Sequence, residues 1–168
     1  MHSFDDLAYR STAFTLSALE ELNSKIMNSL ETGASTASVK GLQMIQLQKT
    51  ILAIGLFSLF ESILQNRLNC RNGFEEAKKV LLKKGKVDLH ARFQDFICAI
   101  NVLKHGLGRS YDALVVKSET LPFRIKLPNE IFFLEGDVSE ISTLIKVDDN
   151  FVLNCAELIE QISKDVRI

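Results

Sequence analysis

The densest group of chemically capable side chains lies at the end of a predicted helix, near position 105 of this 168-residue chain. At 100° per residue, Asn101 and His105 fall on one strip of that helix, and Lys104 lies at its edge. An imidazole transfers a proton near neutral pH, and cationic side chains neutralise developing negative charge. Two glycines follow, and after them come Arg109, Ser110 and Tyr111. This set predicts a site that binds a phosphate or acts on one.

The same residues also have a structural interpretation. His105 stands in the last turn of the predicted helix, where a cation complements the helix dipole, and Asn101 would then bond to a neighbouring loop. Spacing alone leaves both interpretations open. The sequence contains no His, Cys and carboxylate cluster with metal-ligand spacing, so neither a metal nor a cofactor is predicted. The run from Gly106 to Gly108 follows a helix instead of a strand, which excludes a phosphate-binding loop of the nucleotide-binding folds.

The composition predicts a mainly helical protein with one domain covering residues 1–168. Hydrophobic residues make up 46% of the chain, which is enough for a core of ordinary size. Both prolines, Pro122 and Pro128, lie in one short stretch, so the first 121 residues are free of this helix breaker. Apolar periodicity and cap signatures then predict an up-and-down bundle. Its first four helices cover about 3–33, 40–69, 72–85 and 89–106, with caps at Ser3, Asn72 and Asp88 for the first, third and fourth. A helical turn or a short helix follows at 111–116, and a last helix begins at Asp148 or Asp149.

A different pattern occupies residues 119–147, just before the last helix. Apolar and polar residues alternate over 123–127 and again over 141–147, and Ile131 to Leu134 is a further apolar run. Alternation with a period of two is typical of a half-buried strand. These segments therefore predict a small β-rich insertion in the helical domain.

The second predicted helix contains the most apolar run of the chain, Ile51 to Phe60, which is apolar on nearly every side. Such a helix forms either the centre of a bundle or part of a dimer interface, and the two alternatives are compatible. The run is shorter than the roughly 20 residues that span a bilayer. The three cysteines are widely spaced and odd in number, which favours reduced thiols. We therefore expect a cytoplasmic protein without membrane contact.

Charge is distributed unevenly along the chain. The net charge of −1 excludes a uniformly basic surface for nucleic acid. Residues 71–126, however, contain 12 Lys and Arg against 6 Asp and Glu, and residues 127–168 contain 3 against 9. The basic segment either presents a patch to a phosphate-bearing partner or faces the acidic segment of its own chain.

Two stretches together resemble the HEPN superfamily. One is Leu59-Phe60-Glu61-Ser62-Ile63-Leu64 on the long apolar helix. The other is Asn101-Val-Leu-Lys104-His105-Gly106-Leu-Gly108-Arg109-Ser110-Tyr111. This stretch is most similar to an uncharacterised bacterial branch, whose pattern is Asn, two residues, Lys-His-Gly, one residue, Gly, one residue, Ser. The resemblance covers about residues 5–115 and the last helix, and leaves out the β-rich insertion.

The resemblance implies a compact helical bundle that forms a homodimer, here through the long apolar helix. Many members are metal-independent endoribonucleases of toxin–antitoxin and defence systems, and others are non-catalytic modules that bind RNA, a nucleotide or a partner protein such as an antitoxin. It implies catalytic roles for His105, Asn101 and Arg109, and phosphate or nucleic-acid binding by Lys104, Ser110 and Tyr111. Glu61 would support the site from the long helix, or would be an ordinary surface acid.

One feature of the family motif is absent. Its catalytic arginine would stand at Cys98, Ala99 or Ile100, and none of these is charged. Arg109 is a candidate replacement because it follows His105 by about one turn. Arg67 or Arg92 could serve only through the fold or through a partner protomer. The sequence therefore predicts an RNA-directed nuclease, a non-catalytic binding module, or a protein that docks by its apolar helix.

Overall fold

The computed structural model describes residues 4–33, 36–131 and 141–166, and within them the chain is mainly helical. Apolar residues at helical spacing form every one of the helices found there, as the sequence predicts. These are α1 (Phe4–Thr32), α2 (Thr36–Leu68), α3 (Gly73–Lys83), α4 (Val87–His105), α5 (Arg109–Val115) and α6 (Asp149–Val166). The predicted cap at Asn72 is confirmed, since its side chain accepts from the backbone N–H of Glu75 at 3.0 Å. Asp148 likewise accepts from the backbone N–H of Phe151 at 2.9 Å.

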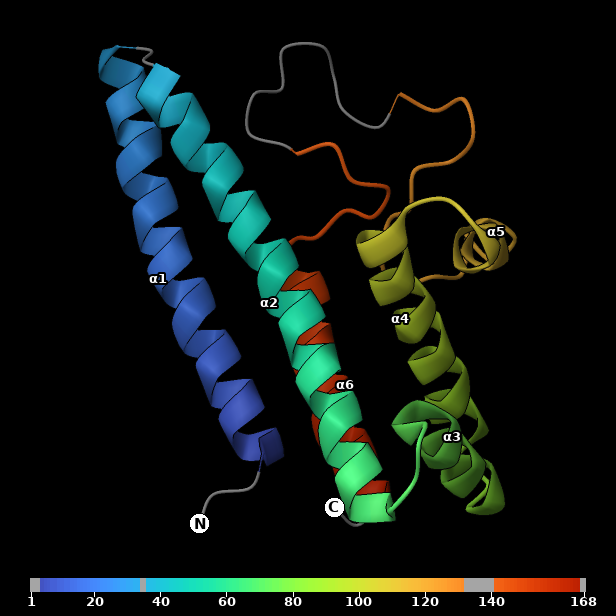
Figure 1. Ribbon diagram of the computed structural model, residues 1–168. Helices are drawn as coiled ribbons and strands as arrows, with labels where there is room; N and C mark the ends of the chain where they lie inside the picture. The colour runs from blue at the N-terminus through green and yellow to red at the C-terminus, as the bar shows by residue number, and fades with distance from the viewer. Residues whose placement is uncertain (1–3, 34–35, 132–140, 167–168) are drawn as a thin grey trace.

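The helices pack as a bundle around α2. The long helices α1 and α2 run antiparallel, α6 lies along both of them, and α3 and α4 cover the other side of α2 (Figure 1). α4 runs antiparallel to α2, and its end at His105 lies beside α5 (Figure 1). The short α5 packs against α4 near that end. The bundle thus holds the end of α4 on a rigid support.

Phenylalanine rings form the centre of the core and join three helices. Phe57 of α2 stacks on Phe96 of α4 with ring centroids 6.4 Å apart, and Phe96 stacks on Phe151 of α6 at 5.4 Å. Phe93 packs against both Phe57 and Phe60. Truncation of a fully buried phenylalanine to alanine typically costs about 3–5 kcal/mol. This cluster therefore fixes the relative positions of α2, α4 and α6.

An ion pair adds a polar link between α2 and α6. The ammonium of Lys49 lies 2.6 Å from a carboxylate oxygen of Asp149, and the lysine side chain is largely buried. Asp149 stands in the first turn of α6, where a negative charge is also favoured by the helix dipole. The pair aligns the start of α6 with the middle of α2.

Two predicted boundaries are wrong by a few residues. α2 begins at Thr36, four positions before the predicted start. α4 begins at Val87 and has Lys86 at its N-cap position without a side-chain hydrogen bond, so Asp88 lies in the first turn and is not the cap. A carboxylate in the first turn still interacts favourably with the helix dipole. The predicted cap at Ser3 lies outside the described residues.

The predicted β-rich insertion at 119–147 is not found in the part of it that the structure describes. There, only one isolated antiparallel bridge joins Ile125 to Ile145, with backbone hydrogen bonds of 2.9 and 3.0 Å on either side. The alternating side chains do enter the core, because Phe123, Ile125, Ile145 and Val147 are all buried. The alternation therefore indicated burial correctly, although the segment between Pro122 and Pro128 forms a single bridge and no ladder. Most of the predicted strand from Ile131 to Leu134 lies outside the described residues.

α2 is not buried on every side. Its inner face packs on four other helices, but Ile51 and Leu59 keep 51% and 59% of their surface exposed. By length and composition alone, α2 would be long enough to cross a membrane, and 33% of its most apolar 18-residue window is buried inside the protein. Core helices of soluble proteins meet the same criterion, so the location of the protein stays a prediction.

Candidate functional site

Two glycines reverse the chain at the end of α4. Gly106 has φ 75° and ψ −138°, and Gly108 has φ 149°, a region that side-chain-bearing residues rarely adopt. The N–H of Gly106 still donates to the carbonyl of Val102 at 2.8 Å, and the carbonyl of Gly108 accepts the first bond of α5 at 3.0 Å. The turn therefore places the first residues of α5 beside the last turn of α4.

This reversal brings several of the predicted site residues together. Asn101 and His105 of α4, with Arg109 and Ser110 of α5, line one hollow of about 320 Å³, which we call the His105 hollow. His105 and Arg109 are exposed, whereas Asn101 and Ser110 are half-buried. The arginine that the family motif lacks at 98–100 therefore has a counterpart that reaches the same hollow from α5.

A second hollow of about 200 Å³ lies beside the first, between α2, α3 and α4, and we call it the polar cleft. Asn101 lines both hollows, so they adjoin on the surface of α4. Glu61 enters the polar cleft from α2 and Lys104 enters it from α4. Its other walls are formed by Phe57, Ser58, Asn72, Phe74, Glu75, Ile97 and Ile100.

A close helix contact forms one side of the polar cleft. At Gly73, the first residue of α3, an added Cβ would lie 2.7 Å from the carbonyl oxygen of Glu61 and 2.7 Å from the Cβ of Leu64. Only glycine permits this approach of α3 to α2. The contact carries Asn72 and Glu75 to the rim of the cleft, opposite α4.

Five of the polar side chains that line the two hollows are available for a ligand. Within the described part of the chain, the side chains of Glu61, Asn101, Lys104, His105 and Arg109 make no hydrogen bond or ion pair. Solvated polar groups that converge on a hollow can exchange water for a ligand without losing an internal partner. This arrangement can hold an anion at the His105 hollow and a polar group in the cleft.

Neighbouring polar residues of α3 and α4, in contrast, are paired with one another. The ammonium of Lys78 lies 2.6 Å from a carboxylate oxygen of Glu75 and donates to the amide oxygen of Gln94 at 2.6 Å. The amide nitrogen of Gln94 donates to the Cys98 sulfur at 3.2 Å. Gln94 therefore helps to hold α3 against α4, and Cys98 is its partner within α4.

Tyr111 lies outside both hollows. Its side chain is buried, and its hydroxyl donates to the carbonyl of Lys126 at 2.7 Å. That bond anchors α5 on the extended segment near Ile125 and so supports the position of Arg109. Nearby, the backbone N–H of Leu127 and the guanidinium of Arg124 lower the pKa of Glu130.

The two other candidate arginines lie away from His105 within one chain. Arg92 donates to the side-chain oxygen of Asn154 at 2.5 Å and lies over the ring of Phe96, so it joins α4 to α6. Arg67 is exposed in the last turn of α2. Of the three arginines, Arg109 is the one that lines the hollow with His105.

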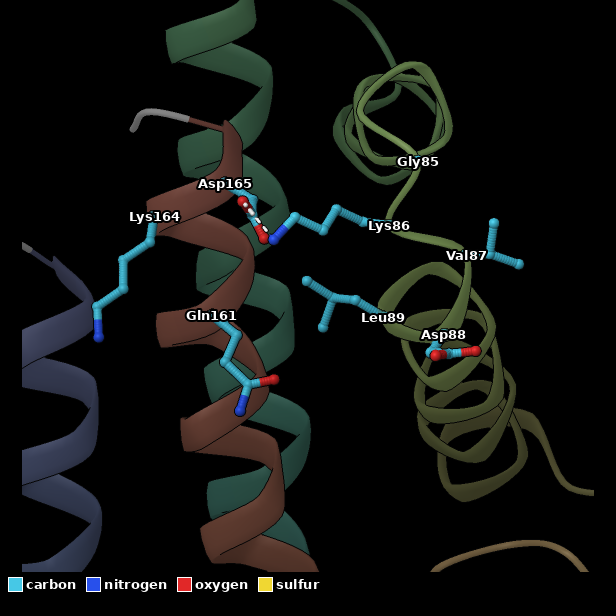
Figure 2. Close-up of a pocket in the computed structure, with 8 residues that line it drawn as sticks. All are labelled: Gly85, Lys86, Val87, Asp88, Leu89, Gln161, Lys164 and Asp165. Carbon is cyan, nitrogen blue, oxygen red and sulfur yellow. Dashed lines mark ion pairs between the residues drawn. The ribbon is translucent and has the colours of Figure 1, made fainter.

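The acidic segment covers a different part of the basic one. Lys86 lies 3.4 Å from a carboxylate oxygen of Asp165, and Lys84 donates to the Asp165 carbonyl, at the start of α4 and the end of α6. Figure 2 shows this region, where Lys86 reaches across an open hollow of about 550 Å³ to Asp165 and Lys164 points away from it. At the other end of α4, Lys104, His105 and Arg109 have no ion-pair partner among residues 4–33, 36–131 and 141–166.

Sequence reasoning missed three residues of the polar cleft: Asn72, Phe74 and Glu75. The capping pattern at Asn72 predicted a helix start there, but only the packing of α3 on α2 places that start near Lys104.

The three cysteines are free, and burial strongly raises the pKa of the Cys155 thiol. Within the residues that the structure describes, no group of three or more His, Cys, Asp or Glu side chains could hold a metal ion.

Comparison of the chain with family models, with curated proteins and with solved structures finds no match. The HEPN resemblance therefore depends on the two sequence stretches alone.

Proposed function

We propose that the protein is a HEPN-like, metal-independent endoribonuclease that acts on single-stranded RNA at the His105 hollow. The observation that carries this proposal is that Asn101, His105 and Arg109 line one hollow although they belong to two helices. Imidazole, amide and guanidinium are the groups that phosphodiester cleavage uses to move protons and stabilise charge. Arg109, the cation that lines this hollow, has no acidic partner within the described part of the chain.

The proposed reaction uses the neighbouring hydroxyl of the RNA itself. The ribose 2′-oxygen attacks phosphorus and loses its proton, while the bond to the 5′-oxygen breaks and that oxygen gains a proton. The products are a 2′,3′-cyclic phosphate and a free 5′-hydroxyl. His105 transfers one of these protons, and Arg109 stabilises the negative charge on the phosphate oxygens. Asn101 and Ser110 orient the phosphate.

We further propose that the site is completed by a second copy of the chain. One protomer offers a single histidine to the hollow, whereas the reaction moves two protons. α2 presents an unpartnered apolar stripe within an arc of about 120°, formed by Met44, Leu47, Ile51 and Leu59. A stripe of this kind favours a symmetric contact between two copies of the helix. The family resemblance adds a toxin-type role to this proposal, in which a partner protein neutralises the nuclease.

The test is cleavage of a fluorescently labelled single-stranded RNA by the purified full chain in the presence of EDTA. We expect cleavage with wild-type protein and its loss in His105→Ala, because the variant lacks the proton-transfer group. His90→Ala is the matched control, since His90 lies near the other end of α4, and it should cleave like wild type. RNA left intact by the wild-type protein, or cut equally by His105→Ala, would contradict the proposal.

A non-catalytic binding module is the second candidate function. It is favoured because no side chain in the described part of the chain orients the His105 ring and because positions 98–100 lack the family's arginine. This alternative predicts RNA binding without cleavage, weakened by Lys104→Ala and by added salt. Absence of binding at low salt would exclude it.

A further inference from the structure

The polar cleft adjoins the His105 hollow but has a different chemical character. Its volume of about 200 Å³ is below the roughly 300–1,000 Å³ of pockets for drug-sized ligands, so it accommodates a single planar ring system. Phe57 and Ile100 at its base are buried, and Phe74 and Ile97 are half-buried. Apolar side chains of this kind pack against the face of a nucleobase.

Hydrogen-bonding groups from three helices surround these apolar side chains. Glu61 offers a carboxylate from α2 that makes no hydrogen bond or ion pair within the described chain. Asn101 and Lys104 offer donors from α4. Glu75 is different, because its carboxylate already pairs with Lys78. The cleft therefore combines one free acceptor-only group with donors on the opposite wall.

We propose that the polar cleft binds a guanine base of single-stranded RNA, next to the phosphate held in the His105 hollow. Guanine presents two adjacent donors, N1–H and the N2 amino group, which together match one carboxylate. Its O6 atom is an acceptor and suits Lys104 or Asn101. Adenine and cytosine present one amino donor beside a ring acceptor, and uracil presents one donor between two acceptors, so each would place a lone pair against Glu61.

The position of the cleft supports this pairing of base and phosphate. Asn101 lines both hollows, and Lys104 and His105 are consecutive residues that face one hollow each. A nucleotide seated with its phosphate at His105 thus has its base beside Glu61. This inference rests on the proposed function, because it assigns base selectivity to the same RNA site.

The test measures binding of the full chain to labelled 2′-O-methyl RNA hexamers, which lack the attacking hydroxyl and are not cut. The hexamers are uridine throughout, or carry one guanosine, adenosine or inosine at an internal position. We expect the guanosine hexamer to bind about tenfold tighter than the uridine and adenosine hexamers, the factor that corresponds to one good bidentate contact. Inosine lacks the N2 amino group and should lose part of this advantage.

The variant Glu61→Gln should abolish the preference for guanosine. It removes a negative charge, so binding of the uridine hexamer should not weaken, and a loss confined to guanosine cannot result from unfolding. Glu20→Gln is the matched control, because it removes the same charge at an exposed position of α1 and should keep the preference. RNA binding without guanosine preference, or a preference that survives in Glu61→Gln, would overturn the inference and leave the proposed function standing. Absence of binding to every hexamer would overturn both.

Discussion

Arg109 is the residue on which the catalytic interpretation depends most. The helix that contains His105 has no arginine at the positions where the family motif has it, yet a tight turn brings Arg109 to the same hollow. Guanidinium groups bind phosphate oxygens in a bidentate manner and remain charged at any physiological pH. We therefore propose that Arg109 acts in place of the missing residue.

We expect Arg109→Ala to lower the rate of RNA cleavage by about 100-fold, the usual consequence of removing one group that stabilises transition-state charge. Arg67→Ala is the control and should leave the rate unchanged, since Arg67 is exposed at the end of α2. Single-turnover cleavage of a labelled RNA measures both. Loss of cleavage in Arg67→Ala but not in Arg109→Ala would mean that Arg67 of a partner protomer supplies the catalytic arginine.

At the scale of elements, the site depends on how α3 and α4 are held against α2. Gly73 permits the first turn of α3 to touch the α2 backbone at Glu61, and the buried phenylalanines fix α4. Glu61 and Lys104 belong to different helices, so their placement around one cleft follows from these two contacts. A change in either contact should alter the cleft before it alters the bundle.

The variant Gly73→Ala tests this dependence. Its methyl group would meet the Glu61 carbonyl at 2.7 Å, and relief of such overpacking typically costs about 1–3 kcal/mol of unfolding free energy. Gly55→Ala is the control, because a Cβ there meets nothing within 4 Å and alanine stabilises a helix by roughly 0.5–1 kcal/mol relative to glycine. Urea unfolding monitored by circular dichroism distinguishes the two. Equal stability of both variants would show that α3 does not approach α2 this closely.

At the scale of the whole molecule, charge and apolar surface are both distributed unevenly. The acidic helix α6 pairs with the basic segment near Lys86, while no acidic side chain that the structure describes pairs with Lys104 at the end of α4. α2 buries one face in the bundle and exposes the other. These two exposed features, one basic and one apolar, are what the proposed dimer and its RNA substrate would use.

We expect the wild-type protein to be dimeric and Leu47→Glu to be monomeric in light scattering coupled to size-exclusion chromatography. A charge placed in a desolvated apolar contact disfavours association. Leu82→Glu is the matched control, because Leu82 on α3 is 50% exposed, close to the 47% of Leu47, but lies off the α2 stripe. A wild-type monomer, or dissociation by both variants, would contradict an α2 interface.

The candidate site was only partly predictable from the sequence. The proximity of Asn101, Lys104 and His105 is local, because they lie within two turns of one helix, and the spacing showed it. The position of Arg109 depended on the backbone angles of Gly106 and Gly108, which the residue types permit but do not dictate. Tyr111 looked like a binding residue, whereas tertiary packing turns its hydroxyl to the Lys126 carbonyl.

The sequence by itself determined the helices, because apolar periodicity, caps and the scarcity of proline act over a few neighbouring residues. The tertiary structure alone decided which helix faces meet. It shows that the alternating segments near Ile125 and Ile145 enter the core without forming a sheet. It also shows that Glu61 and Asn72 border the same cleft as Lys104. Such contacts join residues far apart in the chain, and they depend on the shape of the whole core, which no local pattern records.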